Sequence, residues 1–177
     1  MKNFQKHVMI FLLVMGMAGG VFAQAPYKHS IGVTVGNFEA LSYKTFCTNH
    51  LALQLDLGYK YTVGASRHIN LYINSLELNP NLMYEGHFTK GLYGFIGGGV
   101  SLGYSWNYWG YGWDWVGTYR SDYGKFGVNG ILGLEYKFNI PLTLQIDFRP
   151  GYGMLFNEDV DFNYFDWSVN AGVRYTF

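Results

Sequence analysis

Two short motifs have a spacing that is known for chemistry. Residues 99–103 read GVSLG and fit the G-x-S-x-G pattern of a nucleophilic serine, but that pattern needs a strand–turn–helix context, which this glycine-rich alternating segment lacks. The spacing that opens an EF-hand calcium loop is present at Asp159, Asp161 and Asn163, but the glycine and the distal glutamate that such a loop requires are missing. We therefore predict no catalytic residue, cofactor or metal site, with weak calcium binding by an acidic loop as the alternative.

Charged side chains of both signs recur on the polar face of segments with alternating polarity. If that face is enclosed, the charges must pair, because breaking a buried pair costs about 3–5 kcal/mol. We interpret them as a structural ion-pair network, with a path for protons or ions as the alternative. The predicted network consists of Lys44, Asp56, Lys60, Glu77, Glu85, Lys125, Glu135, Lys137, Asp147, Arg149 and Arg174.

The most unusual stretch is WNYWGYGWDWVGTY at residues 106–119. Aromatic side chains with small spacers are typical of binding loops, so the stretch is a candidate site for an extracellular glycan or protein. The alternatives are that it joins an aromatic girdle or prolongs its two flanking strands as a hairpin. The candidate contact residues are Tyr108, Trp109, Tyr111, Trp113, Asp114 and Trp115.

Residues 1–23 have the pattern of a secretory signal peptide. Lys2 and Lys6 precede an apolar run that is too short to span a bilayer, and small residues follow it, which predicts cleavage after residue 23 or 25. Residues 24–177 then form a single domain. Without the two lysines of the signal, ten Lys and Arg face twelve Asp and Glu, so nucleic acid is not an expected partner.

The composition points to a barrel in a membrane. Aromatic residues make up 20% of the chain and charged residues only 14%, against a usual value of about 25%. After residue 23 no apolar run is long enough for a transmembrane helix. An exported chain of this kind is typical of a transmembrane β-barrel.

Period-2 alternation predicts the strands of an all-β, eight-stranded antiparallel up-and-down transmembrane β-barrel. The links after strands two, four and six are short, whereas longer loops are predicted at 62–70, 107–122 and 155–165. An even strand number places both chain ends on the periplasmic side. The expected strands cover 30–36, 39–46, 51–61, 71–86, 92–106, 123–138, 141–154 and 167–177.

Alternation alone does not say which face points outward. A soluble lipocalin-like barrel, with its apolar face inside, is the alternative. Volume favours the membrane barrel, because an eight-stranded interior is only just wide enough for side chains and the polar face carries the small residues. The expected interfacial girdle consists of Tyr59, Tyr61, Tyr104, Trp106, Tyr136, Phe138, Tyr152 and Trp167.

Three segments resemble small outer-membrane barrels of the OmpX- and OmpA-like type: LSYKTF at 41–46, residues 127–153 and NAGVRYTF at 170–177. The resemblance covers nearly all of residues 24–177, and Pro80 and the short link after residue 36 depart from it. It implies contact with outer-membrane lipid and a structural or surface-interaction role, with a lipid-modifying enzyme or a small pore as alternatives. It also implies that barrel-assembly machinery recognises the terminal strand through Trp167, Val169, Val173, Tyr175 and Phe177.

Overall fold

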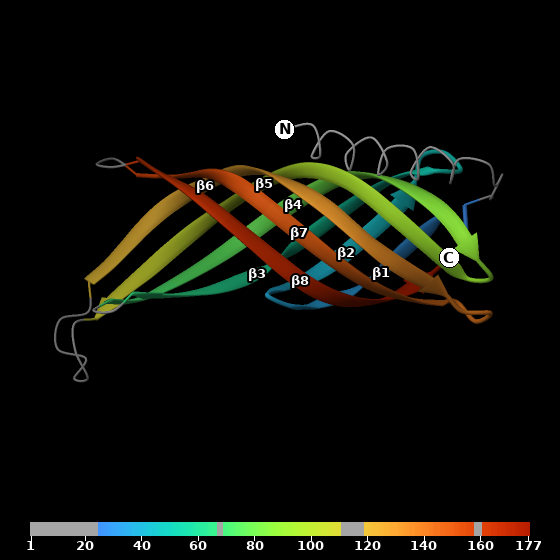
Figure 1. Cartoon of the computed structure of the whole chain (residues 1–177), viewed down its shortest axis with the longest axis horizontal. Helices are drawn as coiled ribbons and strands as arrows, with labels where there is room; N and C mark the ends of the chain where they lie inside the picture. Colours follow the sequence, from blue (N-terminus) through green and yellow to red (C-terminus); the bar gives the residue numbers. More distant parts are fainter. Residues whose placement is uncertain (1–24, 67–68, 111–118, 158–160) are drawn as a thin grey trace, which may run out of the picture.

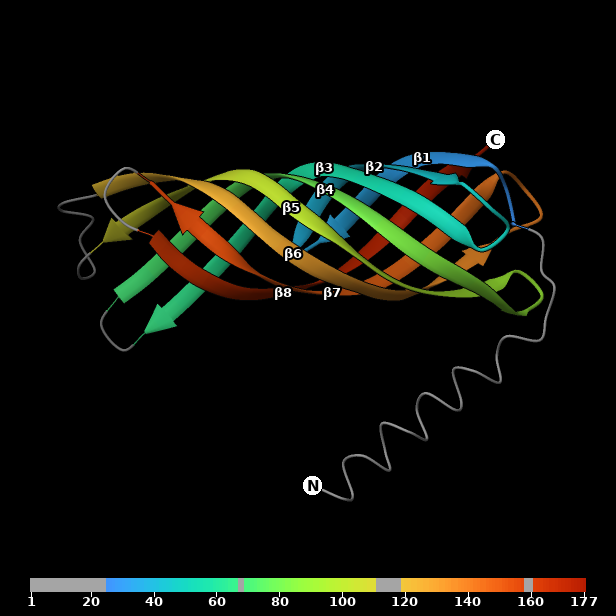
Figure 2. The same ribbon diagram turned by 90° about the horizontal axis from the view of Figure 1, so that it is seen from above.

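The computed structural model is a closed barrel of eight antiparallel strands, each paired with its neighbours in sequence and β8 with β1 (Figures 1 and 2). It describes residues 25–66, 69–110, 119–157 and 161–177, so the predicted signal peptide lies outside the described residues. The predicted fold class is confirmed. The strands are β1 (His29–Gly36), β2 (Phe38–Phe46), β3 (Leu51–Ser66), β4 (Ile69–Thr89), β5 (Leu92–Gly110), β6 (Tyr119–Lys137), β7 (Leu142–Phe156) and β8 (Asp161–Thr176).

The alternating sequence produces an apolar outer surface and a polar interior. Along β2, Ser42 and Lys44 are buried in the lumen, whereas Leu41 and Tyr43 are exposed on the outside. The same alternation holds along the other strands, so the lipocalin-like alternative, with the apolar face inside, is wrong. Among the described residues, no helix has the length and apolar character needed to cross a membrane.

Both ends of the barrel domain meet at one end of the molecule (Figure 1). The backbone of His29 donates to the carbonyl oxygen of Phe177 at 3.0 Å, and Phe177 donates back to His29 at 2.9 Å. The tight turns 47–50, 90–91 and 138–141 lie at this end, and Gly91 adopts a φ of 71° that favours glycine. The short links therefore mark the periplasmic end.

The strands at the opposite end are longer than predicted. The expected loops 62–70, 107–122 and 155–165 are mostly strand, and the links shrink to 67–68, 111–118 and 157–160. Strand pairing continues because hydrogen bonds between neighbouring strands satisfy the backbone N–H and C=O groups in water as well as in lipid. The aromatic and β-branched residues in these segments also favour strands. The predicted loop extents are wrong, and β8 begins at Asp161, six residues before the predicted start.

Two prolines interrupt the ladder without shifting its register. Pro80 pairs with Leu55 of β3, but the pairing of β4 with β5 skips positions 79 and 80. Pro150 pairs with Trp167 of β8, and the pairing of β7 with β6 skips 149 and 150 in the same way. Each proline lacks an N–H for one neighbour only, so a central strand tolerates it here.

A charge on the outer face tests the membrane assignment. We expect Leu132→Arg, at mid-height on the exposed face of β6, to lower the free energy of unfolding by about 2–4 kcal/mol in bilayers. Ile140→Arg, in the periplasmic turn 138–141, is the matched control and should cost about 0–1 kcal/mol. Urea unfolding in lipid vesicles measures both values, and equal costs would contradict a lipid-facing surface at Leu132.

Candidate functional site

The lumen is filled by charged side chains in three clusters along the barrel axis. The first cluster lies nearest the chain ends, where the Lys44 ammonium contacts the Glu85 carboxylate and lies 3.0 Å from Glu135. The Arg174 guanidinium lies 3.7 Å from the same Glu135 carboxylate. Two cations and two carboxylates balance here, and all four side chains are buried.

The middle cluster is organised around Arg149. Its guanidinium lies 2.6 Å from a carboxylate oxygen of Asp56 and 2.6 Å from one of Asp147. This cluster holds one more carboxylate than cations, and neutral amides compensate. Gln54 donates to Asp56, while Gln145 and Asn170 donate to Asp147.

The third cluster lies toward the extracellular end and includes a residue that the sequence analysis missed. The Lys60 ammonium lies 2.6 Å from Asp166, and the Lys125 ammonium lies 3.2 Å from Asp166 and 2.6 Å from Glu77. The Lys125 ammonium also lies 4.4 Å from the ring centroid of Tyr164. Asp166 was missed because strand eight was predicted to begin at Trp167, so the alternation was not followed back to position 166.

Lys137 was predicted to belong to this network, and that prediction is wrong. Its ammonium donates to the backbone oxygens of Phe138 at 2.8 Å and Ile140 at 2.7 Å. β6 ends at Lys137, so the side chain lies at the barrel rim and stabilises the turn that follows. The ten other predicted members all take part in the three clusters.

Tyr27, which precedes β1, covers the first cluster. Its hydroxyl donates to Glu135 at 2.7 Å, and its ring packs edge-on against Phe46 with centroids 5.2 Å apart. Burial and the nearby carboxylates of Glu135 and Glu85 raise the pKa of the Tyr27 hydroxyl well above its usual range, so it remains a donor. The sequence analysis missed Tyr27 because the residue lies outside the alternating segments.

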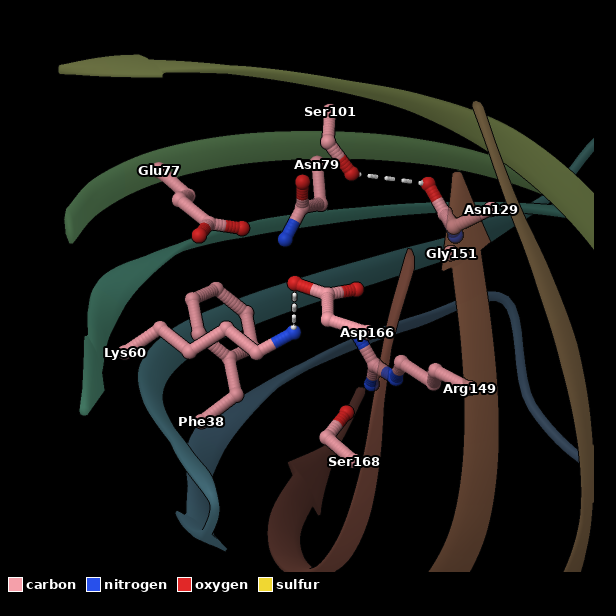
Figure 3. A pocket seen from close by; sticks show the side chains of 10 residues that line it. All are labelled: Phe38, Lys60, Glu77, Asn79, Ser101, Asn129, Arg149, Gly151, Asp166 and Ser168. Carbon is pink, nitrogen blue, oxygen red and sulfur yellow. Dashed lines mark hydrogen bonds and ion pairs between the residues drawn. The ribbon is translucent and has the colours of Figure 1, made fainter. Parts of the chain in front are cut away.

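A cavity of about 20 Å³ lies between the middle and third clusters (Figure 3). A space of that size holds about one water molecule. Asn79 carries a buried side-chain oxygen without a protein partner, which such a water could satisfy. The cavity is lined by Phe38, Lys60, Glu77, Asn79, Ser101, Asn129, Arg149, Gly151, Asp166 and Ser168.

The two chemical motifs do not form their sites. Residues 99–103 lie within β5, where the Ser101 hydroxyl faces the lumen and donates to the Asn129 side chain at 3.2 Å. No turn or helix follows to expose the serine. Asp161 and Asn163 belong to β8, and Asp159 lies outside the described residues. Across the described part of the chain, no group of three or more His, Cys, Asp or Glu side chains could hold a metal ion.

The described part of the aromatic stretch, residues 106–110 and 119, prolongs a hairpin, as one of the alternatives predicted. Tyr108 and Trp109 belong to β5 and pair with Arg120 and Tyr119 of β6. The other candidate contacts lie outside the described residues: Tyr111, Trp113, Asp114 and Trp115. The residues proposed for recognition by assembly machinery lie exposed along the outer face of the terminal segment: Trp167, Val169, Val173, Tyr175 and Phe177.

Comparison with solved structures supports the fold. Neisserial surface protein A is 15% identical over 84% of this chain and 93% of its own, with a TM-score of 0.54. A major outer membrane protein from Thermus thermophilus is 11% identical over 85% of this chain and 98% of its own, with a TM-score of 0.56. No protein-family model matches the chain, and no curated protein matches its sequence.

The predicted resemblance to small outer-membrane barrels is thus confirmed at the level of the fold. The exposed apolar belt independently requires a lipid environment, because a water-facing surface does not carry so many large apolar side chains. A closed β-barrel with such a belt is the architecture of outer-membrane proteins, which places the protein in an outer membrane.

The middle cluster gives a sharp test of the lumen network. Arg149→Met leaves Asp56 and Asp147 buried without their cation, so we expect it to destabilise the barrel by about 3–5 kcal/mol. Adding Asp56→Asn and Asp147→Asn removes the uncompensated charges and should recover most of that loss. Urea unfolding in micelles, followed by the shift in gel mobility on boiling, measures both variants. A triple variant as unstable as Arg149→Met would contradict the pairing.

Proposed function

We propose that the protein is a non-enzymatic outer-membrane barrel with a plugged lumen, which acts through contacts of its extracellular sheet. The observation that carries this proposal is the extension of β3, β4, β5 and β6 beyond the apolar belt. The pairs Ser66 with Ile69 and Trp109 with Tyr119 lie at the tips of this extension. In this proposal the tips extend outside the membrane, where a partner can reach them.

The size of the extension supports a surface role. Tyr61 is the last girdle residue of β3, and the strand continues for five residues to Ser66, which adds about 16 Å along the strand. β4, β5 and β6 continue beside it, so the projection is a paired four-stranded sheet. Among the described residues, the β3 edge of this sheet has no strand neighbour beyond Lys60, because β2 begins at Phe38, which is the partner of Lys60. An open edge and aromatic residues suit an extended protein segment or a glycan.

The packed lumen supports a structural barrel over a pore. The three clusters pair cations and carboxylates from opposite sides of the barrel, as in the contact between Lys44 of β2 and Glu135 of β6. Such pairs leave little room for hydrated ions in an eight-stranded interior. We further propose that barrel-assembly machinery recognises the exposed face of the terminal strand around Tyr175 and Phe177.

Single-channel recording tests the plugged lumen. We expect the protein in planar bilayers to show no conductance steps, because the lumen charges are paired and the cavity between the middle and third clusters has room for about one water molecule. A lipid-modifying activity, the alternative enzymatic role, is measured as a change in lipid A composition when the gene is expressed. Discrete steps, or a changed lipid A, would each contradict the proposed function.

Trimming the projecting hairpin tests the surface role. Replacing residues 107–121 by Asn-Gly joins the paired residues Trp106 and Asp122 through a two-residue turn. We expect vesicles that carry the trimmed barrel to lose retention on a glycan array or on an array of extended peptides, while the gel shift on boiling is kept. Replacing residues 48–50 of the periplasmic turn by Asn-Gly, which joins Cys47 to Leu51 opposite it, is the matched control. Equal retention of the trimmed and full-length barrels would contradict a role for this hairpin.

A further inference from the structure

The wall of the barrel has a notch above the turn between β1 and β2. These two strands have 8 and 9 residues, whereas the six other strands have 15 to 21. β1 stops at Gly36, opposite Asn170 of β8, and β2 starts at Phe38, opposite Lys60 of β3. In Figure 1 this hairpin turns well before the end that β3, β4 and β8 reach. Beyond it, β3 and β8 have no strand neighbour on the sides that face each other.

The notch begins within the apolar belt. The 8 residues of β1 rise about 18 Å along the membrane normal at the usual strand tilt, whereas the belt of such barrels is about 25 Å tall. The lipid-facing side of β8 continues past the hairpin, because Trp167 is 55% and Phe165 is 71% exposed. Across the notch, Tyr61 of β3 is 46% exposed. The open part of the wall therefore lies at the depth of the outer leaflet.

Polar backbone groups of β8 point into this notch. Asn37 closes its lower end, where the Asn37 backbone donates to the carbonyl of Val169 and Val169 donates to the Asn37 side-chain oxygen, each at 3.3 Å. Backbone groups of alternate residues point to the same side of a strand, so those of Trp167 and Phe165 face the notch as well. Unpaired backbone groups cost several kcal/mol in hydrocarbon, so a hydrogen-bonding molecule is needed here.

A lysine stands directly inside the notch. The Lys60 side chain is 8% exposed and spans from β3 to Asp166 of β8, as Figure 3 shows. Asp166 also has the Lys125 ammonium at 3.2 Å. Lys60 can therefore turn toward an external anion without leaving Asp166 unpaired. The notch thus offers a cation, alternating backbone donors and acceptors, and flanking aromatic rings.

We propose that this notch binds the head group of a phosphorylated glycolipid of the outer leaflet. Sugar hydroxyls both donate and accept hydrogen bonds, which matches the mixed groups of a strand edge. The phosphate accepts a charge-assisted hydrogen bond from the Lys60 ammonium, and the aromatic rings of Trp167 and Tyr61 flank the sugar. The acyl chains lie against the exposed apolar side chains below the notch, such as Val35 and Val169.

Native mass spectrometry of the folded barrel in detergent, titrated with lipid A, tests this proposal. We expect one lipid A to bind the wild-type protein, and Lys60→Gln to weaken binding about tenfold because a charge-assisted hydrogen bond is lost. Lys90→Gln removes an exposed lysine at the periplasmic end and is the matched control, with unchanged affinity. Lipid A without phosphates should also bind about tenfold more weakly to the wild type.

A second variant fills the notch instead of changing its charge. Inserting Val-Thr before Asn37 and Thr-Val after it lengthens both strands by two residues and keeps the alternation of faces, with each valine toward lipid and each threonine toward the lumen. We expect this variant to fold, as judged by the gel shift on boiling, and to lose lipid A binding at least tenfold. Wild-type affinity in both Lys60→Gln and the lengthened hairpin would overturn the proposal. So would equal binding of lipid A with and without phosphates, or a second protein chain in place of the lipid.

Discussion

The need to pair every backbone N–H and C=O in lipid is the constraint on which this structure depends. A sheet in hydrocarbon meets it only by closing on itself. The closure joins β8 to β1, so the terminal residue Phe177 is held by two backbone hydrogen bonds to His29 and does not fray. Once the sheet is closed, its two faces meet different environments, and the period-2 sequence separates the apolar side chains from the polar ones.

The narrow interior follows from closing only eight strands. Charged side chains that point inward must pair with one another, and Arg149 shows the result, because it is shared by two carboxylates from different strands. Backbones also approach closely: a Cβ at Gly97 would lie 2.2 Å from the carbonyl oxygen of Leu82, and one at Gly99 would lie 2.0 Å from that of Pro80. Small residues on this face are therefore a requirement of the barrel's size.

The short first hairpin relaxes the closure on one side only. Asn37 provides two hydrogen bonds to Val169 where the ladder between β1 and β8 ends, and Lys60 then reaches Asp166 across the opening. Ion pairing thus replaces strand pairing where the wall is incomplete. The features that set this barrel apart, its projecting sheet and its notch, both lie on the extracellular half, whereas the half near the chain ends is closed by tight turns and by Tyr27.

The sequence by itself determined the fold class, the two faces of each strand and ten of the eleven residues predicted for the lumen network. It could do so because alternation is a local property that a closed membrane sheet turns directly into inside and outside. The tertiary structure decided which charges pair, since Lys60 and Asp166 are 106 residues apart and meet only through the register of the closed barrel. It also decided where strands end: Lys137 falls at a rim, Asp166 falls in the lumen, and the hairpin at Asn37 stops below its neighbours. Strand ends depend on which neighbour remains available for pairing, and a single segment of sequence does not contain that information.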